Sequence, residues 1–333
     1  MTCVFVIYHV MIPLQSLSDL DLAIYKWTNT LNEQLATIAL SYFFAITGFL
    51  LFRNLSKSTI LRKIKSRVMT LLVPYLFWEF LVLGIYYLTG RFRSMDIFTF
   101  YLKSMFLFGG FPPNIPLWYI YTVFALTLLT PILLLLLKNK VVGFITVMVS
   151  FFAVQFVTTN EACSAFASYG IVPVAIKYIP SFLLGAYFGL HFPKPDDLES
   201  LKVIAFVLVF GVLLSSKDLV DLRTSLILAS IPMLLIRFFP ARLCKERKIY
   251  NVSFILYAIH YPIYQYILDL IKSLQPTGFS VSAVNIIFRA VFLPAMIGLS
   301  YLLYKLLSRF TPKLLKLITG SRAVRQNSAL ATK

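Results

Sequence analysis

Long apolar stretches, separated by short polar or basic segments, recur along the whole chain. A helix of about 18 or more mostly apolar residues is long enough to cross the hydrocarbon core of a bilayer. We therefore predict an all-α polytopic membrane protein, a bundle of about ten transmembrane helices. The predicted spans cover residues 1–14, 33–52, 69–89, 116–137, 141–159, 174–190, 202–216, 222–238, 250–274 and 283–307. The first of these spans is short for a hydrocarbon core of about 30 Å.

Basic side chains decide the orientation that this pattern predicts. Most of the 31 Lys and Arg residues fall in alternate connections and in the C-terminal segment, and the connections between them hold few. The basic segments are 53–68, 138–140, 191–202, 237–249 and 305–333, and the opposite loops are 15–32, 90–115, 215–223 and 272–282. Because cytoplasmic loops of membrane proteins carry such an excess, both termini are predicted to be cytoplasmic.

Composition and charge narrow the class of protein further. Apolar residues make up 59% of the chain and charged residues 13%, which excludes an ordinary soluble domain. The net charge of +18 follows the predicted loops, so it indicates contact with membrane lipid and not with nucleic acid. We expect one membrane domain over 1–310 and a basic cytoplasmic tail over 311–333 that is disordered or bound to a surface. Cys3, Cys163 and Cys244 are too far apart in the sequence to predict a metal site or a disulfide framework.

Three ionisable side chains in the predicted spans are candidates for chemistry. An ionisable group inside a membrane is costly, so His9, His260 and Glu79 are functional candidates by default. A neutral imidazole can accept a hydroxyl proton near neutral pH, but a histidine in a helix bundle can equally hydrogen-bond a neighbouring helix. Glu79 either serves a site or pairs with Lys177 or Arg289, the other charges deep in a predicted span.

Six motifs occur in a fixed order along the chain. They read FVIYHV, SYFFAITGFLLF, KSRVMTLLVPYLFW, PLWYIYTVFALTLLTPIL, YIPSFLLGAYFG and ILYAIHYPIY. In this order they resemble the acyltransferase-3 family of integral membrane acyltransferases, whose bacterial members mostly O-acetylate or O-succinylate cell-surface glycans. The resemblance covers nearly the whole chain and depends on the ordered set, because the FF-x-x-[ST]-G-F pattern alone is weak.

The resemblance implies an acyl-CoA-dependent O-acyltransferase of the bacterial inner membrane. It would move an acyl group, with acetyl favoured, to a hydroxyl of a cell-surface or lipid-linked glycan. His9 matches the family histidine that is proposed to activate the acceptor hydroxyl. The family also carries an arginine shortly before this histidine, assigned to the acyl donor, and the sequence has no residue at that place. Either an N-terminal piece is missing, which we favour, or this member has lost part of the donor site.

The basic cluster after the second predicted span supplies candidates for binding the donor. Lys and Arg at a membrane mouth attract and pair with phosphates such as those of acyl-CoA. The donor-binding candidates are Arg67, Lys63, Arg62, Arg53 and Gly48. Arg67 best matches the basic residue that the family places ahead of a helix-opening proline, here Pro74. The same cluster also fits a purely topological or lipid-contacting role, and Gly48 also fits close helix packing.

The implied reaction is attack by an acceptor hydroxyl on a thioester carbonyl, with His9 as general base. The other possible catalytic or acceptor-site residues are His260, Glu79, Tyr42, Trp118 and Tyr119. We expect a cavity lined by residues of the second, fourth and ninth spans, among them Tyr42, Trp118, Tyr119, Tyr257 and His260. No permanently bound cofactor is expected, and acetyl-CoA or succinyl-CoA is the expected donor substrate.

An alternative function is a multi-spanning transporter or exporter of lipid-linked glycans or small molecules. It fits the predicted span count, the apolar surroundings of Glu79 and the basic inner face. A transporter would more naturally show broken helices in corresponding halves of the chain, whereas the placement of the histidines favours the enzyme.

Overall fold

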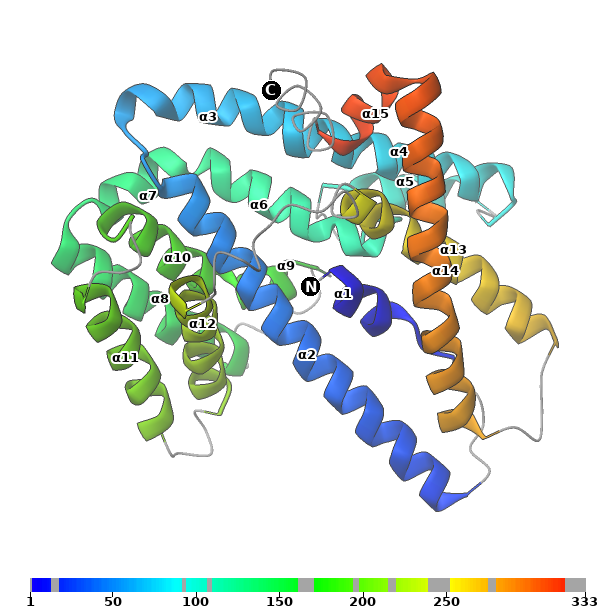
Figure 1. Ribbon diagram of the computed structural model, residues 1–333, viewed down its shortest axis with the longest axis horizontal. Coiled ribbons are helices and arrows are strands. Elements are labelled where there is room, and N and C mark those ends of the chain that lie inside the picture. The colour runs from blue at the N-terminus through cyan, green and yellow to red at the C-terminus, as the bar shows by residue number, and fades with distance from the viewer. Residues whose placement is uncertain are drawn as a thin grey trace.

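Helices make up the regular secondary structure of the residues that the structure describes (Figure 1). The computed structural model describes residues 2–12, 18–91, 94–106, 110–160, 171–193, 198–214, 220–238, 252–274 and 280–320. Cys163, Cys244 and most of the basic segment 237–249 lie outside these residues.

The α-helices follow the predicted apolar segments. They are α1 (Thr2–His9), α2 (Asp19–Phe52), α3 (Ile60–Arg67), α4 (Val73–Leu88), α5 (Met95–Ser104), α6 (Trp118–Leu128), α7 (Thr130–Leu137), α8 (Lys140–Thr159), α9 (Ile171–Ile176), α10 (Ile179–His191), α11 (Leu198–Leu213), α12 (Val220–Phe238), α13 (Ser253–Leu274), α14 (Val281–Phe310) and α15 (Pro312–Thr319). A π-helical turn, Val68–Leu72, joins α3 to α4, and 3₁₀ turns at Lys57–Thr59 and Ile115–Leu117 precede α3 and α6.

Length and hydropathy identify fewer spans than the sequence pattern suggests. Among the described residues, four helices are long and apolar enough to cross a membrane: Asp19–Phe52, Lys57–Leu88, Lys140–Thr159 and Val281–Phe310. A fifth arises if Ile115–Leu128 and Thr130–Leu137, bent by 64°, form one broken span. The chain is therefore a helical membrane protein with four to five candidate spans. The larger number and the cytoplasmic termini remain predictions.

Segment 15–32 was predicted to be an outer loop, and the structure corrects this prediction. Helix α2 begins within it, because Ser18 accepts a hydrogen bond from the Asp21 N–H (3.2 Å) and so caps the first turn. The carboxylates of Asp19 and Asp21 add favourable negative charge at this N-terminus. As a result, the polar residues up to Glu33 lie on a helix that continues into the apolar core.

Two further connections are more ordered than predicted. The loop 90–115 contains α5, which Ser94 caps by accepting from the Ile97 N–H. The segment from 311, predicted to be disordered or bound to a surface, begins with α15, whose Ile318 is buried. The Trp78 indole N–H donates to the Ile318 carbonyl (3.1 Å), so α15 packs on α4. Residues 321–333 of the predicted tail lie outside the described residues.

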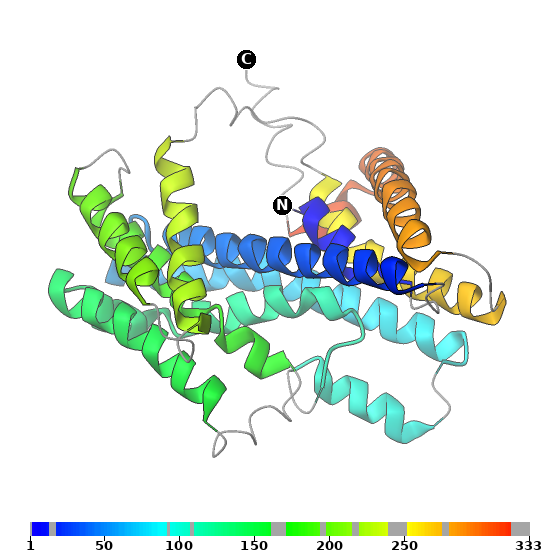
Figure 2. The same cartoon turned by 90° about the horizontal axis from the view of Figure 1, so that it is seen from below.

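Helix α2 runs through the middle of the molecule, with α8 and α10–α12 on one side and α13 and α14 on the other (Figures 1 and 2). Its contact with α10 is backbone against backbone. A Cβ at Gly48 would lie 2.1 Å from the Phe182 carbonyl oxygen, and one at Gly185 would lie 1.9 Å from the Ala45 oxygen. Such small residues let membrane helices approach closely. The contact fixes α10 against α2, the helix in the middle of the molecule.

The backbone beyond α1 is held by side chains of α13 and α14. The amide of Asn285 accepts from the Ile12 N–H (2.7 Å) and donates to the Ile12 carbonyl (2.9 Å). The Tyr264 hydroxyl bonds both backbone groups of Met11, and Arg289 Nε donates to the Val10 carbonyl (2.8 Å). Because backbone groups in a membrane interior need protein partners, these contacts fix where α1 ends.

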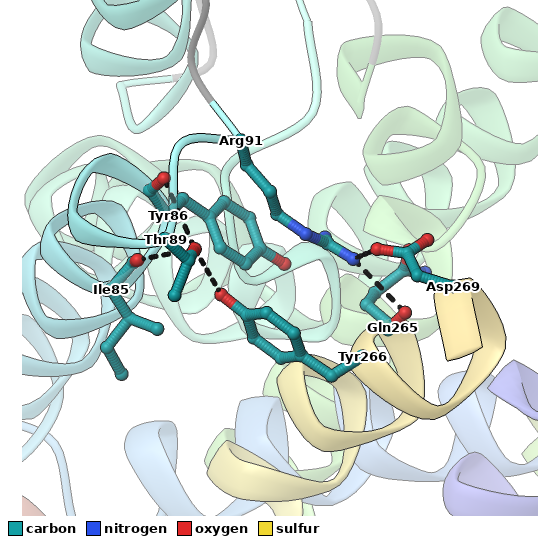
Figure 3. Close-up of polar contacts among 7 residues, drawn as sticks. All are labelled: Ile85, Tyr86, Thr89, Arg91, Gln265, Tyr266 and Asp269. Atoms are coloured by element: carbon teal, nitrogen blue, oxygen red, sulfur yellow. Dashed lines mark hydrogen bonds and ion pairs between the residues drawn. The ribbon is translucent and has the colours of Figure 1, made fainter. Parts of the chain in front are cut away.

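A second clamp joins the end of α4 to α13 (Figure 3). The Arg91 guanidinium pairs with the Asp269 carboxylate and donates to the Gln265 carbonyl (3.1 Å). It lies 4.8 Å from the ring centroid of Tyr86 and 4.6 Å from that of Tyr266, so a ring of each helix contacts the cation. The clamp holds in place the helix that carries His260.

Candidate active site

Two histidines from opposite ends of the chain meet in the interior. His9 is the last residue of α1 and is half-buried, whereas His260, in α13, is fully buried. His260 Nε2 lies 3.5 Å from His9 Nδ1, and the ring centroids are 5.4 Å apart. The two candidates that the sequence places in its first and ninth predicted spans therefore form one pair.

Backbone carbonyls orient both rings. His9 Nδ1 lies 2.8 Å from the Phe5 oxygen, and His260 Nδ1 lies 3.1 Å from the Leu256 oxygen and 2.9 Å from the Tyr257 oxygen. Since a carbonyl only accepts, each Nδ1 carries the hydrogen when the ring is neutral. His260 Nε2 then presents a lone pair towards His9 Nδ1–H. The ring nitrogen of His9 that can accept a proton is Nε2.

His9 opens onto a cavity of about 460 Å³ between α1, α2, α6 and α13. Its walls are mostly aromatic or apolar, with His9, Glu33 and Thr37 as polar members. The lining residues are Phe5, Tyr8, His9, Glu33, Ala36, Thr37, Leu40, Phe111, Ile115, Pro116, Trp118, Val174, Tyr178 and Tyr257. Among the described lining residues, Trp118 is thus the possible catalytic or acceptor-site residue that shares this cavity with His9. His260 supports His9 from behind it.

A second cavity, of about 230 Å³, is lined by Arg67. Arg67 is the last residue of α3 and is half-buried, directly before the π-helical turn. Tyr119 also lines this cavity, and its hydroxyl lies 2.7 Å from the Thr47 hydroxyl and donates to the Phe43 carbonyl (3.1 Å). Tyr119 therefore lies in the cavity of Arg67, which is predicted to bind the acyl donor, and not in the cavity of His9.

Phe5 and Tyr257 line both cavities and form the wall between them. Their ring centroids are 6.3 Å apart, and the planes of the two rings meet at 69°. The Tyr257 hydroxyl donates to the Pro116 carbonyl, which anchors the ring on the connection before α6. The two rings thus lie between the surroundings of Arg67 and those of His9.

The structure gives Glu79 a different partner from those predicted. Glu79 is fully buried, and its Oε2 accepts from the Asn114 backbone N–H (3.0 Å), so the pairing expected with Lys177 or Arg289 is wrong. Asn114 Nδ2 in turn donates to the Ala258 carbonyl (2.8 Å) on α13. Glu79 therefore supports the wall of the His9 cavity without lining it in the described part of the chain.

The other donor-binding candidates differ in their surroundings. Lys63 Nζ donates to the carbonyls of Leu51 (2.6 Å) and Arg53 (3.0 Å), so it caps the end of α2. Arg53 and Arg62 are exposed, and the Arg53 guanidinium lies 5.9 Å from the Phe49 ring centroid. Gly48 faces α10, as described above, which agrees with its helix-packing interpretation.

Tyr42 does not join the other predicted aromatic residues. It is half-buried, with its ring against Phe43 at 6.2 Å, and it does not line either of the two cavities in the described part of the chain.

Sequence reasoning missed Glu33, although Glu33 shares the cavity with His9. The signal was present as the spacing of Asn29, Asn32 and Glu33, which puts the three on one face of a helix. It was lost because the predicted loop ended at residue 32, which placed Asn29 and Asn32 in a loop and Glu33 at the first position of a predicted span.

Comparison with known proteins adds one finding. A family model described as an acyltransferase domain, of the acyltransferase-3 type, matches residues 1–305, a range that includes both histidines and Arg67. No curated protein and no solved structure matches the chain significantly.

Proposed function

Because the chain belongs to the acyltransferase-3 family, we propose that it transfers an acyl group, acetyl in the first place, from acyl-CoA to a hydroxyl of a cell-surface or lipid-linked glycan. The observation that carries this proposal is the adjacency of two cavities, one lined by Arg67 and one by His9, with Phe5 and Tyr257 as their common wall. This arrangement suits group transfer, because it puts a site for the acyl donor next to a base that can activate the acceptor. We place the protein in the bacterial inner membrane.

On the donor side, Arg67 would bind a phosphate of acyl-CoA. Its planar guanidinium matches two oxygens of one phosphate, and the exposed Arg53 and Arg62 raise the local concentration of an anionic donor. The pantetheine arm then extends along Thr47 and Tyr119 towards the wall. This arrangement requires the Arg67 cavity to open towards the cytoplasm, where acyl-CoA is found.

On the acceptor side, His9 Nε2 takes the proton of the acceptor hydroxyl while its oxygen attacks the thioester carbonyl carbon. Negative charge develops on the carbonyl oxygen, and the indole N–H of Trp118 is the proposed donor to it. When the C–S bond breaks, the thiolate leaves with the proton carried by His9. The products are an ester and free CoA, so atoms and charges balance.

His260 is a positioning residue in this proposal. When His9 becomes an imidazolium, its Nδ1–H faces the Phe5 carbonyl and the lone pair of His260 Nε2. Both acceptors favour the charged ring and fix its direction. The transporter alternative has no comparable use for a histidine pair oriented in this way.

The test compares surface glycans by mass spectrometry in cells with and without the gene. We expect a species heavier by one acetyl unit to depend on the gene, and to disappear with His9→Ala at an unchanged level of protein in the membrane. General-base catalysis contributes about 10²–10⁴-fold, so full acylation by His9→Ala would contradict the proposal. His260→Gln should lower kcat with little change in the KM for acyl-CoA, because His260 does not line the donor cavity.

A further inference from the structure

A third cavity, of about 290 Å³, also borders His9 and shares no described lining residue with the Arg67 cavity. It shares Tyr8, His9 and Glu33 with the larger cavity, so the two are neighbours around the proposed base. Its lining is more polar than that of the His9 cavity. The lining residues are Tyr8, His9, Met11, Asn29, Asn32, Glu33, Tyr261, Tyr264, Gln265 and Arg289.

Arg289 is the unusual member of this lining, because it is a nearly buried cation that has no ion-pair partner in the described part of the chain. Its exposed fraction is 8%, and among the described residues no carboxylate lies within 4.0 Å of it. It makes two hydrogen bonds, from Nε to the Val10 carbonyl and from Nη2 to Asn29 Oδ1, both 2.8 Å. A guanidinium has five N–H donors, so the described contacts leave donors available towards the cavity.

A buried charge is costly unless an opposite charge or several hydrogen bonds compensate for it. Two neutral oxygens compensate the Arg289 cation only in part, and the cavity that it lines is large enough for a phosphate or a carboxylate. The planar fork of arginine suits both groups, which it binds through two parallel hydrogen bonds. The chemistry around Arg289 therefore fits an oxyanion.

The lining also contains a group of the opposite charge. Glu33 is exposed, carries the one carboxylate among the described lining residues, and lines both cavities, as His9 does. A carboxylate accepts hydrogen bonds from hydroxyl groups and repels an anion. The amides of Asn32 and Gln265 lie along the same cavity and can bond sugar hydroxyls. Because Arg289 and His9 line the same cavity, an acceptor bound here could pair a negative group with Arg289 and present a hydroxyl to His9.

We propose that this cavity is the acceptor subsite and that it selects an acceptor carrying an oxyanion, either a sugar acid or a sugar phosphate, which Arg289 binds. The inference rests on the proposed function for the identity of the hydroxyl that reacts. It does not depend on that function for binding, since anion binding by Arg289 can be measured without acyl transfer.

The test uses the full-length protein in detergent and follows its thermal unfolding by tryptophan fluorescence at constant ionic strength. The added compounds are glucuronate, glucose 1-phosphate, glucose and glycerol 3-phosphate. We expect the two anionic sugars to raise the Tm of the wild type by about 2–4 °C well above their Kd, and glucose to have a much smaller effect. Arg289→Gln should weaken their binding by about tenfold or more.

Two matched variants separate binding from folding. Arg289 also holds the end of α1, and Asn285→Ala loosens the same segment without touching the guanidinium. Asn285→Ala should unfold earlier but keep its response to the anionic sugars. The response is measured without acyl-CoA, so failure of the proposed catalysis does not remove the binding result.

Three outcomes would overturn the inference. An equal response to glucose and to the anionic sugars would show that the cavity does not select charge. An equal response in wild type and Arg289→Gln would place the anion elsewhere. A response to glycerol 3-phosphate alone would assign the site to a lipid headgroup and not to the acceptor.

Discussion

Phe5 and Tyr257 each contribute to the site through two different groups. Their rings form the wall between the Arg67 cavity and the His9 cavity, and their carbonyl oxygens hold the Nδ1–H groups of His9 and His260. A backbone shift that moves either ring therefore moves a histidine as well. The position of the wall and the orientation of the proposed base, His9, thus depend on the same two residues.

The wall predicts how the enzyme selects the length of the acyl group. Phe5→Leu removes part of the wall while keeping an apolar side chain, so butyryl transfer should rise relative to acetyl transfer by about tenfold. Tyr257→Phe keeps the ring and should leave this ratio near that of the wild type. The measurement is the ratio of rates with the two acyl-CoA donors, which does not depend on the yield of folded protein. An unchanged ratio in Phe5→Leu would show that the acyl group takes another route.

At the scale of elements, the contact of α2 with α10 carries the strongest geometric constraint. Gly185 and Gly189 are one turn apart on α10, and a Cβ at Gly189 would lie 2.4 Å from the Phe49 carbonyl oxygen. Carbonyl oxygens in a helix cannot move away singly, so a side chain at these positions must separate the two helices.

Gly185→Ala should accordingly destabilise the protein by about 1–3 kcal/mol, the usual cost of overpacking a core. The matched control is Gly84→Ala in α4, where an added Cβ would meet nothing within 4 Å. That change should be neutral or stabilising, because alanine favours helix over glycine by about 1 kcal/mol. Thermal unfolding of both variants in the same detergent measures the difference. Equal Tm values would contradict the backbone contact.

The sequence predicts those parts of the architecture that depend on local signals. Apolar runs are local, and each predicted span overlaps a helix, although only four to five candidate membrane spans are found among the described residues. The start of α2 was missed because its first turns are polar. The meeting of His9 with His260, and of Arg289 with Val10, depends on packing between distant segments. His9 could be identified from its motif, but its neighbours could not.

At the scale of the whole molecule, the three cavities form a series. The Arg67 cavity shares Phe5 and Tyr257 with the His9 cavity, which shares Tyr8, His9 and Glu33 with the Arg289 cavity. The donor and acceptor sites proposed here thus lie on opposite sides of the base. Such an order lets a cytoplasmic thioester and an outward-facing acceptor meet without either substrate crossing the membrane completely.

This order requires one orientation in the membrane, which accessible cysteines can test. Ser58 lies in the basic connection before α3, and Met95 begins α5; both are exposed. In a variant with Cys3, Cys163 and Cys244 replaced by alanine, a membrane-impermeant maleimide should label Met95→Cys in intact spheroplasts and Ser58→Cys only after permeabilisation. The excess of Lys and Arg around Ser58 predicts this result.

The opposite labelling pattern would have a specific consequence. If Ser58→Cys reacts in intact spheroplasts, α3 and the Arg67 cavity face outward, where no acyl-CoA is present to bind them. The basic side chains would then need another anionic partner, and the His9 cavity could not receive its acyl group from that side. Labelling of Met95→Cys alone instead leaves Arg67 facing the compartment that contains the donor, as the proposed transfer requires.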